Sequence, residues 1–338
     1  MSDTTFLQKT LAGETAMGLP YCLSHGTAVQ VLDEGVIRFE PSDATQSVLD
    51  LVISCGIHGN ETAPVELVEQ LIERIFAHQL RVKSRVLFIF GNVAALRMGQ
   101  RFVEEDMNRL FNRSPEVDDG MEKRRAMMLE MHVGRFFSSS DAQCKPRFHY
   151  DLHTAIHGSL IEKFAIYPLP KPGCSFSATE IARLSLAGVD TVLLQSTQSS
   201  TFSFSSNHRY DAQAFTIELG SARPFGQNQS IDLSKMDAYL SALIQGELPV
   251  PELVPPQVQI FRVSREIPKT SHDFKFAIDG KTDNFTPLAK GLTLAVDAGV
   301  PFVITEDDAR IIFPNPEVPP GQRAGLVIVP ARDFLAQV

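Results

Sequence analysis

The chain has 338 residues, of which 43% are hydrophobic and 21% are charged, and its formal net charge is −9. This composition is typical of a globular protein large enough for two domains, and the acidic balance argues against general nucleic-acid binding, which needs a basic face. No stretch approaches the roughly 18 apolar residues of a membrane span, and the N-terminus has no basic segment followed by an apolar run. We therefore expect neither a nucleic-acid nor a membrane partner.

The four cysteines, Cys22, Cys55, Cys144 and Cys174, are scattered along the chain. This spacing does not suggest a disulfide framework and favours a reducing, cytoplasmic location. A small anionic partner is compatible with the negative net charge, because a few arginines can make one cleft locally positive. The sequence leaves open whether the chain forms a homo-oligomer.

The first predicted unit is strand, loop, helix, strand. Residues 47–54 (SVLDLVIS) and 85–92 (RVLFIFGN) are short apolar runs that predict strands. Between them, apolar residues recur at helical spacing over 65–76, and Pro64 stands where a first-turn proline is tolerated. The pattern is that of a βαβ unit.

The same alternation continues further along the chain. Helices are predicted over 122–137, 178–188 and 234–247, and strands over 147–154, 164–169, 191–195 and 214–220. The serine-rich segment 199–206 (SSTFSFSS) is predicted to be a loop. Strands that alternate with helices imply an α/β fold, with a mixed, mostly parallel sheet flanked by helices on both faces. Catalytic groups in such folds collect at the carboxyl ends of strands.

The character of the sequence changes at residues 248–257 (LPVPELVPPQ), where four prolines predict a linker. Beyond it, short β-rich runs are separated by turns, without a convincing helix: VQIFRV, DFKFAI, LTLAVD, PFVIT and GLVIV. We therefore expect a larger α/β domain over residues 1–250 and a smaller C-terminal all-β domain over residues 256–338.

His58 and Glu61 follow the first predicted strand directly. Imidazole nitrogen and carboxylate oxygen are zinc ligands, and a catalytic zinc commonly keeps three protein ligands and one open position. Gly56 and Gly59 allow the intervening turn to bend and to approach other backbone closely. A histidine and a glutamate at this spacing also occur by chance in ordinary loops, so a metal site needs a third ligand from elsewhere.

His153 offers that ligand, because it sits where a predicted strand meets a turn. Asp151 lies two residues earlier, points to the same side of the strand, and could orient the imidazole. His149 and His157 compete for the role, but we favour satisfied or exposed histidines there. Cys55 could be a thiolate ligand, although a small buried residue at a strand end is the favoured interpretation.

Glu218 stands in an apolar strand (AFTIELG) just before a glycine. A buried, unpaired carboxylate would cost several kcal/mol, so Glu218 is either a strand-end residue exposed to water or a general base with a raised pKa.

The segment 97–111 (RMGQRFVEEDMNRLF) offers two arginines, Arg101 and Arg109, together with Asn108. A guanidinium fork and an amide can hold a substrate carboxylate. The alternative is an ordinary loop in which Arg109 pairs with Asp106 at the surface.

Taken in order, the motifs GIHGNET, DMNRLF, DLHTA and TIELG resemble the succinylglutamate desuccinylase and aspartoacylase family, which is related to zinc carboxypeptidases. The longer segments SCGIHGNETAPVE, DLHTAIHGS and ELGSARPFGQN are most similar to the desuccinylase branch, and FPNPEVPPGQRAGLV is typical of the family's C-terminal β domain. The similarity spans most of the chain.

The resemblance implies a zinc-carboxypeptidase-like fold and a role for each matching residue. It implies one Zn²⁺ per subunit, held by His58, Glu61 and His153, with Glu218 as the catalytic glutamate. It further implies that Arg101 polarises the scissile carbonyl and that Asn108 and Arg109 hold a substrate carboxylate.

The resemblance also implies hydrolysis of N-succinyl-L-glutamate to succinate and L-glutamate, the last step of arginine degradation by the succinyltransferase route. One position departs from the family pattern, because the arginine expected ten residues before the catalytic glutamate is replaced by His208. Either the neighbouring Arg209 binds substrate from a shifted loop, or the substrate contacts differ. The alternatives are a related N-acyl-amino-acid deacylase such as an aspartoacylase, a carboxypeptidase, a non-catalytic zinc- or ligand-binding protein, and a structural protein.

Overall fold

The computed structural model describes residues 4–43, 47–112, 120–139, 145–156, 158–251, 253–279, 282–332 and 334. Within these ranges, every helix is too short or too polar to cross a membrane.

Among the described residues the helices lie in the first three quarters of the chain, α1 ahead of the first strand and the others between strands. They are α1 (Phe6–Ala12), α2 (Thr62–Phe76), α3 (Val93–Met98), the 3-10 helix η2 (Met107–Arg109), α4 (Met121–Ser138), α5 (Ala178–Leu186), α6 (Phe202–Tyr210) and α7 (Ser234–Ile244). The strands are β1 (Tyr21–Cys22), β2 (Ala28–Asp33), β3 (Val36–Glu40), β4 (Asp50–Cys55), β5 (Arg85–Phe90), β6 (Arg147–Ala155), β7 (Lys163–Tyr167), β8 (Thr191–Leu194), β9 (Gln213–Ser221), β10 (Gln259–Pro268), β11 (Lys275–Phe276), β12 (Thr293–Asp297), β13 (Val300–Val303), β14 (Arg310–Ile312) and β15 (Arg323–Pro330).

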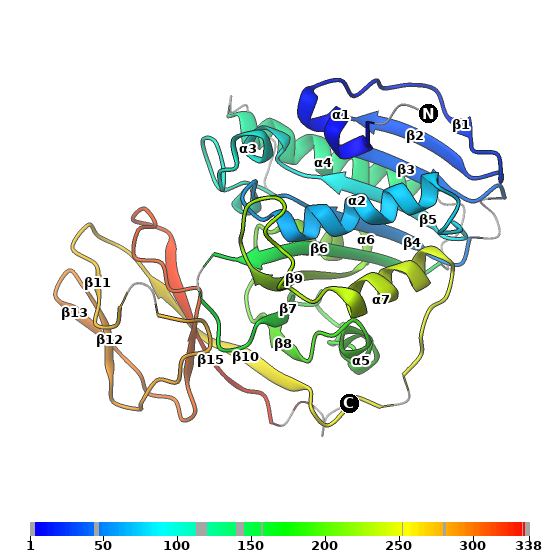
Figure 1. Ribbon diagram of the computed structural model, residues 1–338. Coiled ribbons are helices and arrows are strands. Elements are labelled where there is room, and N and C mark those ends of the chain that lie inside the picture. The colour runs from blue at the N-terminus through cyan, green and yellow to red at the C-terminus, as the bar shows by residue number, and fades with distance from the viewer. Residues whose placement is uncertain are drawn as a thin grey trace.

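One large sheet runs through the molecule in the order β1-β2-β3-β5-β4-β6-β9-β7-β8-β10-β15-β14 (Figure 1). Its central strands β5, β4, β6 and β9 are parallel, and β7, β8 and β10 form a second parallel run that joins β9 in antiparallel fashion. The outer strands on both sides pair antiparallel, so the mixed α/β class is confirmed. In this register Cys55 pairs with Leu152, and His153 pairs with Glu218. The carboxyl ends of β4, β6 and β9 therefore meet at one edge of the sheet.

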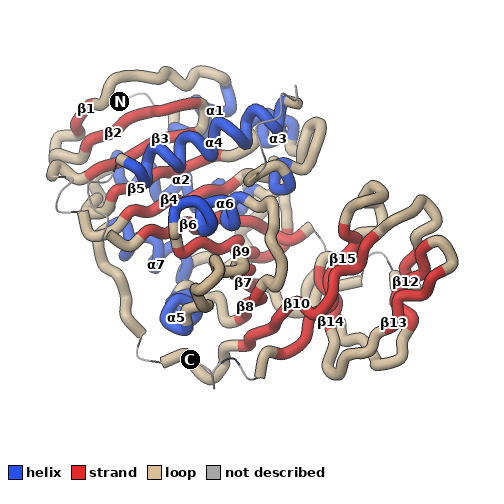
Figure 2. The backbone as a smooth tube through the Cα atoms, turned by 180° about the vertical axis from the view of Figure 1, so that it is seen from behind, coloured by secondary structure: helices blue, strands red, loops and turns tan. Residues whose placement is uncertain are grey.

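Helices cover both faces of the sheet, as the alternation of elements predicts. Leu51 and Ile53 of β4 belong to the apolar cluster that includes α2 and α7, which lie in front in Figure 1. Val52 points the other way, into a second cluster with Leu129 of α4, and α4 and α6 lie in front in Figure 2. Because alternate strand residues are covered on opposite faces, β4 is buried throughout.

The C-terminal β region (residues 256–332) joins the same sheet. Its β10 pairs in parallel with β8, with Gln259 opposite Thr191, and β15 and β14 follow. A separate three-stranded sheet of β11, β12 and β13 lies at the far side of this region (Figure 1). Strands are present at all five runs predicted here. The division into domains at residues 250 and 256 stays a prediction, since the large sheet is continuous across it.

The C-terminal β region also forms hydrogen bonds to the loop that follows β6. Asn284 is buried, its backbone N–H donates to the Gly158 carbonyl at 2.8 Å, and its carbonyl accepts from the Leu160 N–H at 3.1 Å. Its side-chain oxygen accepts from the Phe313 N–H at 2.7 Å. These bonds fix the chain a few residues beyond His153.

The predicted loop at 199–206 is wrong, because α6 begins at Phe202. Thr201 caps this helix by accepting a hydrogen bond from the Phe204 N–H, and both phenylalanines are buried. Serine favours loops when its hydroxyl competes for the backbone. In α6 the buried serine hydroxyls bond to side chains of other elements instead, so tertiary contacts override the local preference. The antiparallel strands β1–β3 are a flank that the sequence patterns do not predict.

Candidate active site

Two glycines shape the loop that carries His58 and Glu61. Gly56 has φ +64°, in the left-handed region that favours glycine. A Cβ atom on Gly59 would lie 2.1 Å from the Ala95 carbonyl carbon, so only glycine lets this loop touch α3. The loop ends at Glu61, the residue that precedes α2, and both predicted ligands are buried.

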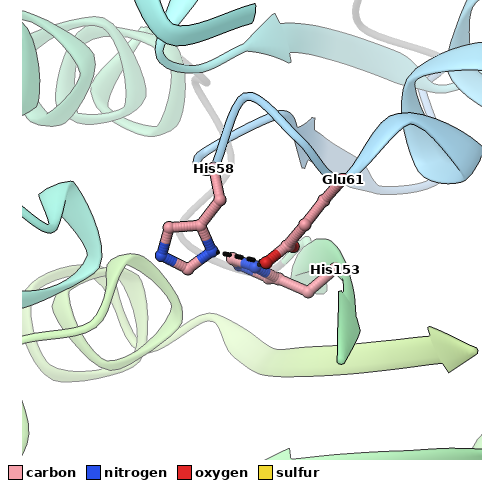
Figure 3. Close-up of side chains that lie close together, drawn as sticks. All are labelled: His58, Glu61 and His153. Atoms are coloured by element: carbon pink, nitrogen blue, oxygen red, sulfur yellow. Dashed lines mark hydrogen bonds and ion pairs between the residues drawn. The ribbon is translucent and has the colours of Figure 1, made fainter. Parts of the chain in front are cut away.

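His58, Glu61 and His153 meet at the carboxyl ends of β4 and β6 (Figure 3). The Nδ1 atom of His58 lies 2.7 Å from Glu61 Oε1, and the Nδ1 atom of His153 lies 2.9 Å from Glu61 Oε2. One ligand atom from each residue lies within 4.8 Å of the others, and all three side chains are buried. The structure thus brings the three predicted ligands into one cluster that could hold a metal ion.

The second nitrogen of each imidazole faces an aspartate. His153 Nε2 lies 3.0 Å from Asp151 Oδ2, which confirms the expected contact, and His58 Nε2 lies 2.9 Å from Asp106 Oδ1. Sequence reasoning considered Asp106 only as a surface partner of Arg109 and missed its contact with His58. An aspartate on the outer nitrogen fixes a ligating imidazole, so Nδ1 is the atom of each ring that could face a metal ion.

These contacts shift the pKa values of the acidic and basic side chains in the cluster. Burial alone would raise the pKa of Glu61 and of Asp106, but the neighbouring imidazoles outweigh it and hold both pKa values below their usual range. Burial lowers the pKa of His153, yet the charges of Asp151 and Glu61 dominate and raise that pKa well above its ordinary value.

Glu218 lies on β9 beside His153 and is buried, with 7% of its surface exposed. Its Oε2 atom is buried and has no hydrogen-bond partner among the described residues. Burial and the charge of Glu61 raise its pKa to about 7, against the opposing effect of His153 and other nearby cations. A carboxyl group with this pKa can both accept and donate a proton near neutral pH.

Arg101 and Asn108 lie at the same edge of the sheet. Arg101 Nη1 donates to Glu61 Oε1 at 3.1 Å and Nη2 donates to Asp106 Oδ2 at 3.4 Å, so the guanidinium borders the cluster. The Asn108 Oδ1 atom accepts a hydrogen bond from the Phe202 N–H, at 3.0 Å. This bond fixes the orientation of the side-chain amide, whose NH₂ group is its hydrogen-bond donor. Half-buried Arg109 is adjacent in η2.

Arg209 makes its contacts elsewhere. Its Nε donates to Asn112 Oδ1 at 3.3 Å, and its Nη1 lies 3.7 Å from Glu130 Oε2. The bond to Asn112 ties Arg209 to the end of the segment that carries Asn108. Its neighbour His208 stacks on the Phe204 ring, 5.4 Å between centroids. Direct substrate binding by Arg209 stays a prediction.

The competing ligand candidates have other surroundings. His149 is fully buried and both of its nitrogens bond to serine hydroxyls, as expected of a satisfied histidine. Cys55 is buried, and burial together with nearby Asp151 raises the pKa of its thiol well above the usual value, which disfavours a thiolate ligand. His157 lies outside the described residues.

Comparison with known proteins gives two family matches. Residues 47–244 match the succinylglutamate desuccinylase/aspartoacylase catalytic domain, and residues 256–331 match the AstE/AspA barrel-sandwich hybrid domain.

Individual relatives match over nearly the whole chain. A succinylglutamate desuccinylase of Pseudomonas putida is 47% identical over 306 residues, which is 90% of each chain. The crystal structure of such an enzyme from Vibrio parahaemolyticus is 35% identical and superposes with a TM-score of 0.88, covering 97% of this chain and 95% of that one. The structure of the Chromobacterium violaceum enzyme is 38% identical, with a TM-score of 0.82 and coverage of 97% and 98%.

We expect metal binding at this cluster to release about one proton and to weaken as the pH falls, because a metal ion on His153 Nδ1 must displace the proton held there. Since the pKa of His153 is raised above its ordinary value, this competition extends through neutral pH, and the apparent affinity should rise by up to about tenfold per pH unit.

Titration calorimetry in buffers of different ionisation enthalpy measures the number of protons released. Asp151→Asn is the matched comparison, because losing the aspartate charge should lower the pKa of His153 and reduce the proton release at pH 7. An affinity independent of pH between 6 and 8 would contradict the expectation.

Proposed function

The chain belongs to the succinylglutamate desuccinylase/aspartoacylase family, and we propose that its His58, Glu61 and His153 cluster holds one zinc ion per subunit for the hydrolysis of N-succinyl-L-glutamate to succinate and L-glutamate. The chain is a metal-dependent hydrolase of the desuccinylase type, as relatives 45–47% identical over 90% or more of both chains bear out. The observation that carries the proposal is the buried cluster of two histidines and one glutamate with Glu218 beside it.

The donor set supports zinc as the metal. Two imidazole nitrogens and one carboxylate oxygen form a three-ligand set of the kind found in catalytic zinc sites, which keep a further position open. The contacts of Asp106 and Asp151 with the outer nitrogens hold the two rings in the orientation that such a site needs. When bound, the metal supplies a Lewis acid that polarises a carbonyl and lowers the pKa of water.

Glu218 is proposed as the group that moves the proton. The Glu218 carboxylate accepts a proton from the attacking water. The resulting carboxylic acid gives the proton to the amide nitrogen of the substrate as its C–N bond breaks, which releases L-glutamate. The pKa of about 7 supports both halves of this role, since neither protonation state is strongly disfavoured at neutral pH.

The cationic and amide groups at the edge of the cluster are proposed to bind the substrate. Arg101 points its guanidinium at Glu61 and would stabilise the negative charge that develops on the scissile carbonyl oxygen. Asn108 offers its amide N–H groups and Arg109 its planar fork to a substrate carboxylate. Positive charge concentrated here would explain how a chain of net charge −9 accepts a substrate with three carboxylates.

The test of this function is metal content combined with hydrolysis. We expect about one zinc per chain, turnover of N-succinylglutamate, loss of turnover with a chelator, and recovery when zinc is returned. N-acetylaspartate and small peptides are the comparison substrates, because they represent the alternative deacylase and peptidase activities. A higher kcat/KM for either would overturn the proposed substrate, and cobalt or manganese in place of zinc would overturn the proposed metal.

Replacing the proposed proton carrier separates catalysis from metal binding. We expect Glu218→Gln to lower kcat by at least about 100-fold, because general acid–base catalysis typically contributes 10²–10⁴. The zinc content should stay at the wild-type level. Glu69→Gln is the matched control, since Glu69 is another buried glutamate with a raised pKa, but it accepts hydrogen bonds from the Leu7 N–H on α1. Full turnover in Glu218→Gln would refute the assigned role.

Two arginine variants test how the substrate carboxylate is held. Arg109→Ala should raise KM by about 10-fold or more with a smaller change in kcat, since it removes a charge-assisted contact present in ground and transition states. Arg209→Ala should raise KM by the same factor if Arg209 binds substrate directly, and much less if it only holds Asn112. Steady-state kinetics on N-succinylglutamate distinguishes these outcomes, and an unchanged KM in Arg109→Ala would rule out the proposed contact.

A further inference from the structure

A chain of hydrogen-bonded side chains leads away from His153 into the interior. Asp151 Oδ1 accepts from the Ser54 hydroxyl at 2.5 Å, and the same hydroxyl oxygen lies 2.8 Å from His149 Nε2. The other nitrogen of His149, Nδ1, lies 2.7 Å from the Ser206 hydroxyl of α6. All five side chains are at most 1% exposed, so water does not compete for these bonds.

The direction of every bond in this chain follows from donor and acceptor counting. A carboxylate only accepts, so Ser54 gives its single proton to Asp151 and must accept from His149 Nε2–H. Burial lowers the pKa of His149 to about 4, so at neutral pH this imidazole carries one N–H. With that proton on Nε2, His149 Nδ1 accepts from the Ser206 hydroxyl.

The same counting continues to the metal cluster. Asp151 has its Oδ1 occupied by Ser54 and turns its Oδ2 to His153 Nε2. That carboxylate oxygen accepts, so His153 Nε2 holds a proton, and Nδ1 would present its lone pair to a metal once it gives up the proton that it donates to Glu61. The lone pair that a metal needs is therefore specified by hydrogen bonds that begin on α6.

We propose that Ser54, His149 and Ser206 are positioning residues of the metal site, which fix Asp151 and through it the tautomer and orientation of His153. This inference rests on the proposed function, because it assumes that His153 is a metal ligand. It also gives the serine-rich segment SSTFSFSS a role. Ser206 ties α6 to His149, while the first residue of α6, Phe202, holds Asn108 through its N–H.

The chain supplies a matched control on the same helix. Ser203 is as buried as Ser206, and its hydroxyl bonds to Thr216 of β9 at 2.8 Å, outside the chain that reaches His153. Serine-to-alanine changes at positions 203 and 206 thus remove the same atom from the same kind of environment. Only Ser206→Ala interrupts the hydrogen-bonded chain that leads to His153.

The experiment measures zinc affinity by competition with a chromophoric chelator for the full chain and for Ser54→Ala, Ser206→Ala, the double variant and Ser203→Ala. We expect Ser54→Ala to weaken zinc binding by about tenfold, at the lower end of the 10–100-fold typical for partners of metal ligands. Ser206→Ala should weaken it by a smaller factor. The double variant should match Ser54→Ala, because the chain is already broken at Asp151. Ser203→Ala should bind zinc as the wild type does.

The controls separate positioning from loss of fold and from failure of the metal site. Thermal unfolding of each metal-free variant identifies changes that merely loosen the core, and at saturating zinc the kcat of Ser54→Ala should return close to the wild-type value. Wild-type affinity in both Ser54→Ala and Ser206→Ala overturns the inference alone. An equal loss in Ser203→Ala also overturns it, since the effect would then be general to α6. A wild-type chain without stoichiometric zinc overturns the inference together with the proposed function.

Discussion

Parallel pairing of β4, β6 and β9 is the constraint on which the active site depends. His58, His153 and Glu218 are far apart in sequence, and they meet because each stands at the same end of one of three adjacent strands. A slip of one residue in either pairing would turn the side chains at these ends to the opposite face. The apolar clusters on both faces therefore do more than stabilise the sheet, since they hold the register that aligns the site.

The buried charges explain why this edge of the sheet favours a cation. Glu61, Asp106, Asp151 and Glu218 bring four carboxyl groups close to two imidazoles and Arg101. Burying this many acids is costly unless positive charge accompanies them. Burial together with the charge of Glu61 raises the pKa of Glu218, and the charges of Asp151 and Glu61 raise the pKa of His153. A divalent metal ion would offset this negative charge.

Much of the site could be predicted from sequence, because its central residues follow recognisable strands. His58, Glu61, His153 and Glu218 each stand at the end of an apolar run, where α/β folds collect functional groups. The role of Asp106 could not be predicted in this way, since no local pattern says that it meets His58 from a different loop. The sequence predicts a loop where α6 lies, because the partners of the α6 serines, such as His149 and Thr216, are distant in sequence. For the same reason, the position of Arg209 beside Glu130 has no sequence signal.

The continuity of the large sheet has a consequence for synthesis of the chain. β8 finds its outer neighbour only in β10, some 65 residues later, and β10 is in turn covered by β15 close to the C-terminus. While the chain emerges from the ribosome, β8 is an open edge whose backbone groups can pair with a strand of another nascent molecule. Truncation ahead of β10 would leave that edge permanently uncovered. By covering β8, the C-terminal β region removes an edge at which two molecules could pair and aggregate.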